Sequence, residues 1–377
     1  MDNMNNEMLK KQENEVAIIM VPFPAQSHLN QQLQLACIFS SSYDLPVHFI
    51  GSATHNHQAR VRANGLKPSD IAKIHFHDIP TPDFASPAPD PNAFTKFPSQ
   101  LLPSYNACTL LRGPISLLLR DISSKSRRVV VVHDVLMSYN VQDIYLKKLP
   151  ILEPDAPEEI NKLVEFQLQF RDIRAGDLYN SNKLLEGTYL DLMEKFASTQ
   201  NKKQWAIGPI FLAAKVDHVS DKRNKCLDWL DNQPPRSVLY VSFGSSTTFS
   251  DKEVMELAMG LERSKQKFVW VLRDGDRECI TAGVPMAAWA MHSEQPLNAF
   301  FVTEILKTGL LVREWKNHEE LVTASAIENV VRKLMASEEG DEIRKRAEEL
   351  GAAVRESIEK GGASQLELDS FIAHITR

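Results

Sequence analysis

Apolar residues in the first part of the chain form short runs of strand type that alternate with segments of helical spacing. VAIIMV, at residues 16 to 21, is a β-branched run that ends at PFPAQS, and apolar residues then recur at helical intervals. The same order returns with PVHFIG, a helical segment through HNHQARVRANG, and KIHFHDI. Each strand is short and apolar enough to be covered on both faces. The alternation therefore predicts an α/β fold with a parallel sheet.

The second part of the chain repeats this alternation. SVLYVSF, the helical DKEVMELAMGLERS and KFVWVL form one strand-helix-strand unit, and PMAAW and GLLVREW predict two more strands. With 377 residues, the chain is long enough for two domains. The predicted organisation is a polar tail (1–15), a first domain (16–212), a linker (213–224), a second domain (225–362) and a C-terminal helix (363–377) that packs back on the first domain.

Composition and charge narrow the classes of function. The net charge of -6 is mild and spread along the chain, so we expect no nucleic-acid partner. The polar N-terminal segment lacks the apolar run of a secretory signal, and no window is apolar enough to span a bilayer. We therefore expect a cytoplasmic protein without membrane insertion. The four cysteines are scattered and form no CxxC pair, which argues against a zinc site and a disulfide framework: Cys37, Cys108, Cys226 and Cys279.

Two polar residues follow strands of the first predicted sheet. His28 stands just after VAIIMV, at the start of a helix, and Asp134 stands just after VVVV. Ligands collect beyond the carboxyl ends of parallel strands, so both residues lie where a site is expected. If the two strands are neighbours, Asp134 can fix the tautomer of His28 and stabilise its imidazolium, as the partner of a general base does. The alternative for each residue is structural, as a helix-start residue and as a turn cap.

SFGSSTTFSD follows a strand and precedes a helix in the second half. Gly244 would let the backbone approach a ligand, and Ser245 can offer its hydroxyl and amide to a phosphate. The motif is neither GxGxxG nor a P-loop, so nicotinamide enzymes and P-loop NTPases receive no support. The alternative is a serine-rich turn in which Ser250 or Asp251 caps the next helix.

HSEQPLN is a second candidate for ligand binding in the second half. It places Glu294 and Gln295 at the start of a helix, where a carboxylate and an amide can bind vicinal hydroxyls of a sugar. The alternative is an ordinary first turn, because acidic residues favour that end of the helix dipole. No cluster of metal ligands is visible in the sequence.

One connection in the second half is short. Only about a dozen residues separate KFVWVL from VPMAAW, whereas a parallel crossover with its helix needs roughly ten to twelve residues at the very least. Either this connection is unusually tight or a segment is absent.

Five segments carry a resemblance that covers nearly the whole chain: FPAQSHLNQ, VVVVHD, SVLYVSFGSSTTFSD, KFVWVLRD and GVPMAAWAMHSEQPLNAFFVTEILKTGLLVREW. Together they resemble the plant UDP-dependent glycosyltransferases of small molecules, with the zeatin O-glucosyltransferase group as the nearest likeness. The resemblance implies a GT-B architecture, in which two Rossmann-like domains face each other across a cleft. It implies that the first domain binds the acceptor and the second binds the nucleotide sugar.

The resemblance also implies roles for the candidate residues. It implies that His28 deprotonates the acceptor hydroxyl and that Asp134 is its carboxylate partner. The implied reaction is an inverting displacement at the anomeric carbon in which UDP leaves, with UDP-sugar as co-substrate and no cofactor or metal. Ser245 matches the position near the donor phosphates, and Glu294 and Gln295 match the pair that holds glucose hydroxyls.

The chain departs from the family pattern at the short connection. The family's donor box begins with Trp-Ala-Pro-Gln and passes through His-Cys-Gly-Trp-Asn-Ser before Gly-Val-Pro, whereas here VLRDGDRECI runs directly into TAGVP. Ala290 and Ser27 also replace a usual proline and a common glycine. The absent part would supply the uracil-stacking ring, worth on the order of 1–3 kcal/mol, and phosphate hydrogen bonds worth about as much each. We therefore expect donor binding weakened by many powers of ten, because about 1.4 kcal/mol is tenfold.

Two functions stay open at this point. The first is a UDP-glucose-dependent O-glucosyltransferase for a small hydroxylated plant metabolite such as the cytokinin zeatin, acting as a monomer. The second is a catalytically impaired derivative, the product of a truncated gene, that retains at most acceptor binding. An NAD-dependent oxidoreductase shares the alternation of strands and helices but lacks the glycine fingerprint.

Overall fold

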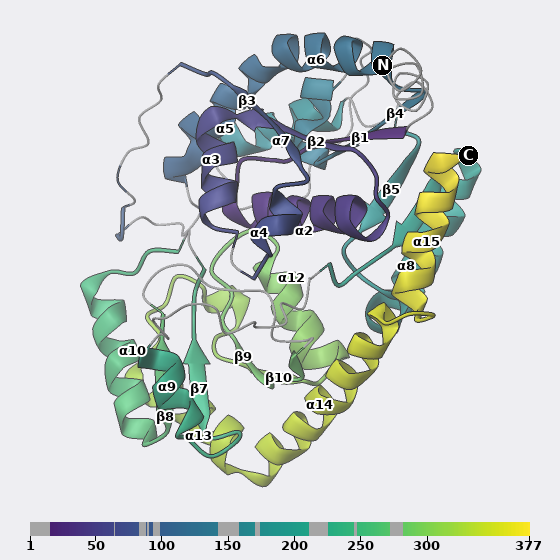
Figure 1. Ribbon diagram of the computed structural model, residues 1–377. Helices are drawn as coiled ribbons and strands as arrows, with labels where there is room; N and C mark the ends of the chain where they lie inside the picture. Colours follow the sequence, from purple (N-terminus) through teal and green to yellow (C-terminus); the bar gives the residue numbers. More distant parts are fainter. Residues whose placement is uncertain are drawn as a thin grey trace.

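The structure is a computed structural model of the chain, and it describes residues 16–63, 65–82, 88, 90–92, 99–141, 158–169, 174–210, 225–244, 247–271 and 282–377. The predicted tail, the predicted linker and Ser245 lie outside the described residues. Figure 1 shows two α/β halves, the first in purple to teal and the second mainly in green. The alternation of strands and helices along the chain has therefore produced the α/β fold that it predicts.

The first half is built on a four-stranded parallel sheet of order β3-β2-β1-β4. Its strands are β1 (Val16–Val21), β2 (Val47–Ser52), β3 (His75–Ile79) and β4 (Arg128–His133). β4 joins β1 from the far side, with Val21 opposite His133. This register brings the carboxyl ends of β1 and β4 to the same edge of the sheet.

Helices cover both faces of this sheet. The helices around it are α2 (Gln26–Ser42), α3 (Ala53–Val61), α4 (Pro68–Ile71), α5 (Leu102–Ala107), α6 (Arg112–Lys125) and α7 (Glu158–Leu168), with 3-10 turns η1 (Ser99–Leu101), η2 (Cys108–Leu111) and η3 (Val135–Val141). A further helix, α8 (Lys183–Thr199), packs on the strand β6 (Lys203–Ala206). Pro103 and Pro114 stand in the first turns of α5 and α6, where the missing N–H has no helical acceptor to lose. A separate parallel pair, β5 (Gly176–Tyr179) and β6 (Lys203–Ala206), completes the half.

β1 is buried on both faces, as its uninterrupted apolar run predicts. Ile18 and Met20 pack into one hydrophobic cluster, and Ile19 and Val21 pack into another on the opposite face. All four side chains are 0% exposed. Full burial of such a side chain contributes about 1.5–3 kcal/mol, so β1 holds both layers of the half together.

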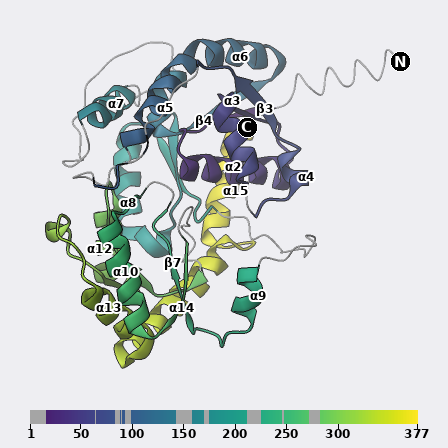
Figure 2. The ribbon, with the colours of Figure 1, turned by 90° about the vertical axis from the view of Figure 1, so that its left-hand side faces the viewer.

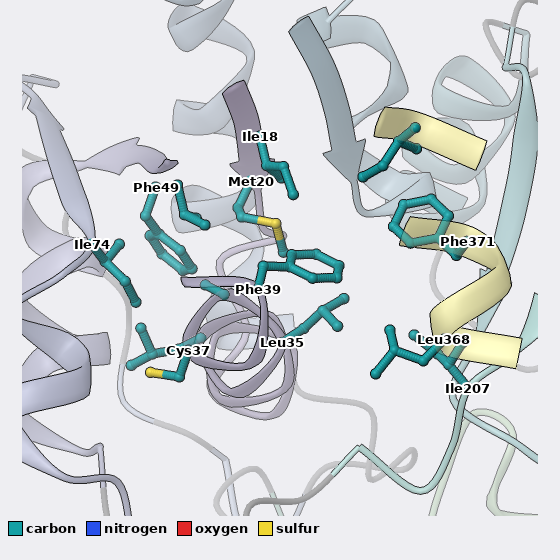
Figure 3. Packing of buried hydrophobic residues seen from close by; sticks show 14 of the residues in the cluster. Ile18, Met20, Leu35, Cys37, Phe39, Phe49, Ile74, Ile207, Leu368 and Phe371 are labelled. Carbon is teal, nitrogen blue, oxygen red and sulfur yellow. The ribbon is translucent and has the colours of Figure 1, made fainter. Parts of the chain in front are cut away.

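The C-terminal helix α15 (Ala363–Thr376) packs on the first half, although the helix before it, α14 (Glu338–Ile358), rises from the second (Figures 1 and 2). The ring of Phe371 lies 5.8 Å from that of Phe39 and 5.1 Å from that of Trp205. Figure 3 shows Phe371 and Leu368 beside the cluster around Phe39. The last helix therefore shares the core of the first half.

The second half has two sheets of two strands each in its described part. β7 (Val238–Val241) pairs with β8 (Lys267–Trp270), and β9 (Met286–Ala288) pairs with β10 (Gly309–Leu311). Both pairs are parallel. The helices of this half are α9 (Lys225–Asp231), α10 (Asp251–Ser264), α12 (Gln295–Phe300), the π-helical η5 (Phe301–Ile305), the 3-10 turn η6 (Trp315–Asn317), α13 (Ala324–Ala336) and α14.

α13 holds these two pairs of strands in place. It packs on α10 and also contacts β9 and β10. The contact with α10 is close, because a Cβ on Gly260 would lie 2.6 Å from the side chain of Ile327. A glycine is thus required where the two helices cross.

Candidate active site

His28 and Asp134 meet at the edge of the first sheet. α2 begins directly after β1, which places His28 in the first helical turn, and Asp134 directly follows β4. The Nδ1 atom of His28 lies 2.6 Å from Oδ2 of Asp134. The predicted contact depended on β1 and β4 being neighbours, and the register of the two strands fulfils that condition.

Hydrogen bonds of both the backbone and the side chain fix Asp134. Its backbone N–H donates to the carbonyl of Val21 at 3.0 Å, and its Oδ1 accepts from the N–H of Leu136 at 3.0 Å. Its side chain is 13% exposed, against 34% for His28. Burial raises the pKa of this carboxyl, but the bonds from His28 and Leu136 outweigh burial, and the pKa lies below its ordinary value. The group is therefore an anion at neutral pH.

The contact with Asp134 assigns the roles of the two ring nitrogens of His28. An ionised carboxylate accepts hydrogen bonds only, so Nδ1–H is the donor and Nε2 is the nitrogen that can take a proton. The ring of Phe23 meets the imidazole edge to face at 5.3 Å. Asp134 and Phe23 together fix the direction of the ring.

His28 does not cap its helix, whereas Asp134 does cap a turn. α2 has no side-chain cap at its N-terminus, and the side chain of His28 contacts Asp134 instead. Asp134 does cap a turn, since Oδ1 accepts from the amide two residues on, while Oδ2 contacts His28. One carboxylate thus caps a turn with one oxygen and orients His28 with the other.

A cavity of about 1270 Å³ opens beside His28 and extends into the second half. Aromatic and aliphatic side chains from the first half line it, among them Phe23, Tyr105, Leu136 and Leu163. Burial, followed by the proximity of Cys108, raises the pKa of the Tyr105 hydroxyl to about 12, so this hydroxyl stays protonated. His28 lines the same cavity.

Gly244 lines the same cavity from the second half. Its φ is +73°, and a Cβ at this position would meet no heavy atom within 4 Å. The residue supplies the left-handed turn after β7 and leaves open space for a ligand. Ser250 adopts the structural alternative, because it caps α10 in a capping box with Glu253.

Glu294 and Gln295 also line the cavity, at the start of α12. The carboxamide Oε1 of Gln295 accepts from the backbone N–H of Met291 at 2.8 Å and of His292 at 3.4 Å. This oxygen therefore fixes the loop that precedes α12. Glu294 is exposed toward solvent.

Sequence reasoning did not identify the aromatic side chains of the site. Phe243, Phe249 and Trp289 form a cluster with ring centroids 4.6 to 6.0 Å apart. The indole Nε1 of Trp289 is buried and has no hydrogen-bond partner within the described part of the chain. Their positions after the ends of β7 and β9 are the signal that could have found them, since ligands collect at such ends.

The described ranges contain no group of three or more His, Cys, Asp or Glu side chains placed to hold a metal ion. No helix within them has both the length and the apolar character of a bilayer span.

The sequence matches a family model and curated relatives. The model for the glycosyltransferase N-terminal domain matches residues 14–153 and 145–212. Zeatin O-xylosyltransferase of Phaseolus vulgaris is 36% identical over 463 residues, covering 98% of this chain and 100% of the relative. Zeatin O-glucosyltransferase of Phaseolus lunatus is also 36% identical, covering 97% and 98% of the two chains.

Solved plant glycosyltransferase structures share the fold. Phytolacca americana UGT2 in complex with UDP-2-fluoro-glucose and pterostilbene has a TM-score of 0.72 at 20% identity, covering 96% of this chain and 99% of that one. Glycyrrhiza uralensis UGT73P12 in complex with glycyrrhetinic acid 3-O-monoglucuronide has a TM-score of 0.70 at 22% identity, covering 96% of each chain. The predicted GT-B architecture is confirmed.

The match to the Phaseolus vulgaris relative is longer than this chain. It extends over 463 aligned positions, while the chain has 377 residues, so at least 86 positions of the relative (463 less 377) have no counterpart here. Because 98% of the chain and all of the relative are covered, most of these positions fall inside the matched region. Internal segments of the relative are therefore absent from this chain.

Proposed function

This chain belongs to the plant UDP-dependent glycosyltransferase family, and on that premise we propose that it transfers glucose from UDP-glucose to a hydroxyl group of a small plant metabolite. Glycosyl transfer to a small molecule follows from the family. The sugar and the acceptor are parts of the proposal. Zeatin is the acceptor best supported, because it is named in the relatives that match nearly the full length of the chain.

The observation that carries the proposal is the His28–Asp134 pair beside the cavity. In the proposed step, Nε2 of His28 removes the proton of the acceptor hydroxyl, and Asp134 stabilises the imidazolium that results. The acceptor oxygen forms its bond to the anomeric carbon as the bond to the diphosphate oxygen breaks. UDP leaves with that electron pair, and the anomeric configuration inverts.

The proposed reaction needs no metal or other cofactor. Ser245 and Gly244 would approach the diphosphate, and Glu294 would accept hydrogen bonds from hydroxyls of the sugar. Gln295 has an amide nitrogen to offer, since its oxygen is engaged with the Met291 amide. These are assignments by family and position.

The experiment is a transfer assay on the full chain. The purified protein is incubated with trans-zeatin and either UDP-glucose or UDP-xylose, and the products are separated by liquid chromatography with mass detection. A zeatin glucoside is the expected product. A xyloside alone would correct the sugar, and no product while the Phaseolus vulgaris relative reacts in parallel would refute transferase activity in this chain.

A second candidate function is a binding protein that retains the acceptor site without turnover. The short connection after KFVWVL favours it, because the sequence lacks the family's donor box there. Calorimetric titration separates the two candidates. Binding of zeatin without detectable binding of UDP-glucose supports the second, and ordinary UDP-glucose binding excludes it.

A further inference from the structure

The last residues of β4 reach both faces of the first sheet. Successive side chains of a strand point to opposite faces. Val132 packs on the hydrophobic cluster that contains the buried side of α2, whereas Val131 packs on the cluster of the other face. Continued along the chain, this order directs Asp134 toward α2 and His28, and it directs the side chain of His133 to the opposite face.

His133 binds the backbone of Asp134 with its side chain. Its Nδ1 atom lies 2.8 Å from the carbonyl oxygen of Asp134. A carbonyl oxygen only accepts hydrogen bonds, so Nδ1–H is the donor. The same oxygen accepts from the N–H of Met137 at 2.9 Å, and the N–H of Asp134 donates to the carbonyl of Val21 at 3.0 Å. The peptide groups on either side of the Asp134 Cα atom are therefore both fixed.

The bond from His133 adds what the neighbouring bonds do not supply. Leu136 and Met137, which donate to the side chain and the carbonyl of Asp134, both belong to the turn η3 that follows it. Those two bonds close the turn on itself and would move with it. His133 is the last residue of β4, so its Nδ1–H ties the carbonyl of Asp134 to the sheet.

The imidazole of His133 is uncharged at neutral pH. Burial lowers its pKa and outweighs the hydrogen bond to Asp134, which raises it. The other charged side chains that act on it are Asp177 and Arg174, which pair with each other. A cationic imidazole here would share the negative charge of Asp134 with His28. A neutral donor fixes the backbone and leaves that charge to His28.

We propose that His133 is a positioning residue for the His28–Asp134 pair. It holds the backbone from which the carboxylate of Asp134 extends, and it thereby keeps Oδ2 in line with Nδ1–H of His28. His133 is not among the residues that line the cavity, so it acts through Asp134 and not on a bound molecule. A misplacement of about 1 Å in such a pair can cost about a hundredfold in rate. The effect on rate rests on the proposed function, whereas the effect on the geometry of the pair does not.

The first test measures the pair without any transfer reaction. Nuclear magnetic resonance on the full chain follows the exchange of the His28 Nδ1–H proton with water, and His28→Gln identifies the signal by its loss. We expect His133→Leu to accelerate this exchange at least about fivefold, which is roughly the value of one hydrogen bond. His133→Asn should stay within about twofold of the unchanged chain, because the Asn Nδ2 atom takes the place of Nδ1 and keeps the donor. Equal exchange in His133→Leu and the unchanged chain would overturn the proposal.

Two further variants show whether His133 acts through Asp134. His48→Leu is the matched control, because it removes a half-buried imidazole of the same sheet that bonds to His77 and not to Asp134. It should leave the exchange of the His28 proton unchanged. In an Asp134→Ala background, His133→Leu should have no additional effect on that exchange. An equal effect of the control, or a full effect without the carboxylate, would contradict the proposed route.

The unchanged chain decides the question even if His133→Leu does not fold. Nitrogen chemical shifts are expected to place the ring proton of His133 on Nδ1 at neutral pH, and a proton on Nε2 alone would refute the proposal. Where transfer is measurable, His133→Leu should lower kcat about tenfold and leave the KM for the acceptor within about twofold. Absence of transfer with a protected His28 proton would count against the proposed function alone. An unchanged kcat and an unchanged proton signal in His133→Leu would count against the positioning role alone.

Discussion

The two halves of this molecule start from the same strand-helix-strand unit and reach different degrees of completion. In the first, β1 lies between two parallel neighbours and is fully buried. In the described part of the second, four short strands form two separate pairs, and both pairs line a cavity of about 1270 Å³ through β7 and β9. The described strands of the second half therefore form a less continuous sheet than those of the first. Under the proposed function this difference concerns the donor side.

The largest expected effect separates the two substrates. UDP-glucose should bind this chain at least about a thousandfold more weakly than it binds the zeatin O-glucosyltransferase of Phaseolus lunatus, because the sequence lacks the two segments in which we expect the stacking ring and phosphate donors. Zeatin should bind the two proteins within about tenfold, because the proposed function places the acceptor beside His28 in the first half. Calorimetric titration of both proteins measures the two ratios. Equal affinities of the two proteins for UDP-glucose would contradict the expected difference between the two halves.

The next effect concerns the acceptor side alone. In any preparation that shows transfer, His28→Ala should lower kcat/KM by about 10²- to 10⁴-fold, the range for loss of a general base, with zeatin affinity little changed. Asp134→Asn should act in the same direction by removing the anion that stabilises the imidazolium. His57→Ala is the matched control, because His57 is exposed on α3. A loss in the control as large as in His28→Ala would argue against the proposed base.

Core substitutions compare packing in the two halves. Phe39→Ala, at a side chain that is 0% exposed, should lower the free energy of unfolding of the first half by about 3–5 kcal/mol. Leu239→Ala, on β7 beside the cavity, should cost no more than about 1 kcal/mol, because fewer packed neighbours are lost. Urea titration with segment-resolved hydrogen exchange measures both, with Leu117→Ala as an exposed control. A larger effect at Leu239 would show that β7 is as tightly packed as β1.

The smallest predicted effect is a pH dependence in the first half. Burial lowers the pKa of His55 to about 4, and burial with the neighbouring His77 and His75 lowers that of His48 to about 4. As the pH falls, the unfolded chain therefore takes up protons before the folded chain does. The stability that the neutral His55 and His48 contribute is complete above pH 6.5 and is lost as the pH falls toward 4. Each histidine should account for about 1 kcal/mol between pH 6.5 and 5.5. His55→Gln should reduce the pH dependence of the free energy of unfolding. An unchanged pH dependence would show that His55 does not contribute to it.

Much of the fold could be predicted from the sequence, because periodicity reports burial directly. VAIIMV became a strand with six buried residues, and α12 begins at Gln295 as the motif predicted. The meeting of His28 and Asp134 could be predicted only as a condition, because it depends on β4 crossing to the far side of β1. Pairing across about a hundred residues has no local signal in the chain.

Other parts of the site could not be predicted, for physical reasons that differ from residue to residue. The inward hydrogen bond of Gln295 depends on the loop geometry around Ser293, whose φ is +56°. The contact of Phe23 with the imidazole depends on a turn of irregular backbone after β1. The short connection after KFVWVL indicated an absent segment, and the positions of the relative without counterpart support that interpretation. Ser245 lies outside the described residues, and its role stays a prediction.

The return of α15 to the first half constrains how the molecule can move. The chain passes from the first half to the second between Ile210 and Lys225, and it passes back through α14 and α15. Arg127 anchors the returning end by donating to the carbonyl of Thr376 at 2.9 Å. A joint with two crossings resists wide separation and favours a limited rotation about the axis through both. We therefore expect the cleft to open by a small rotation, because the contact of α15 with the first half limits the movement.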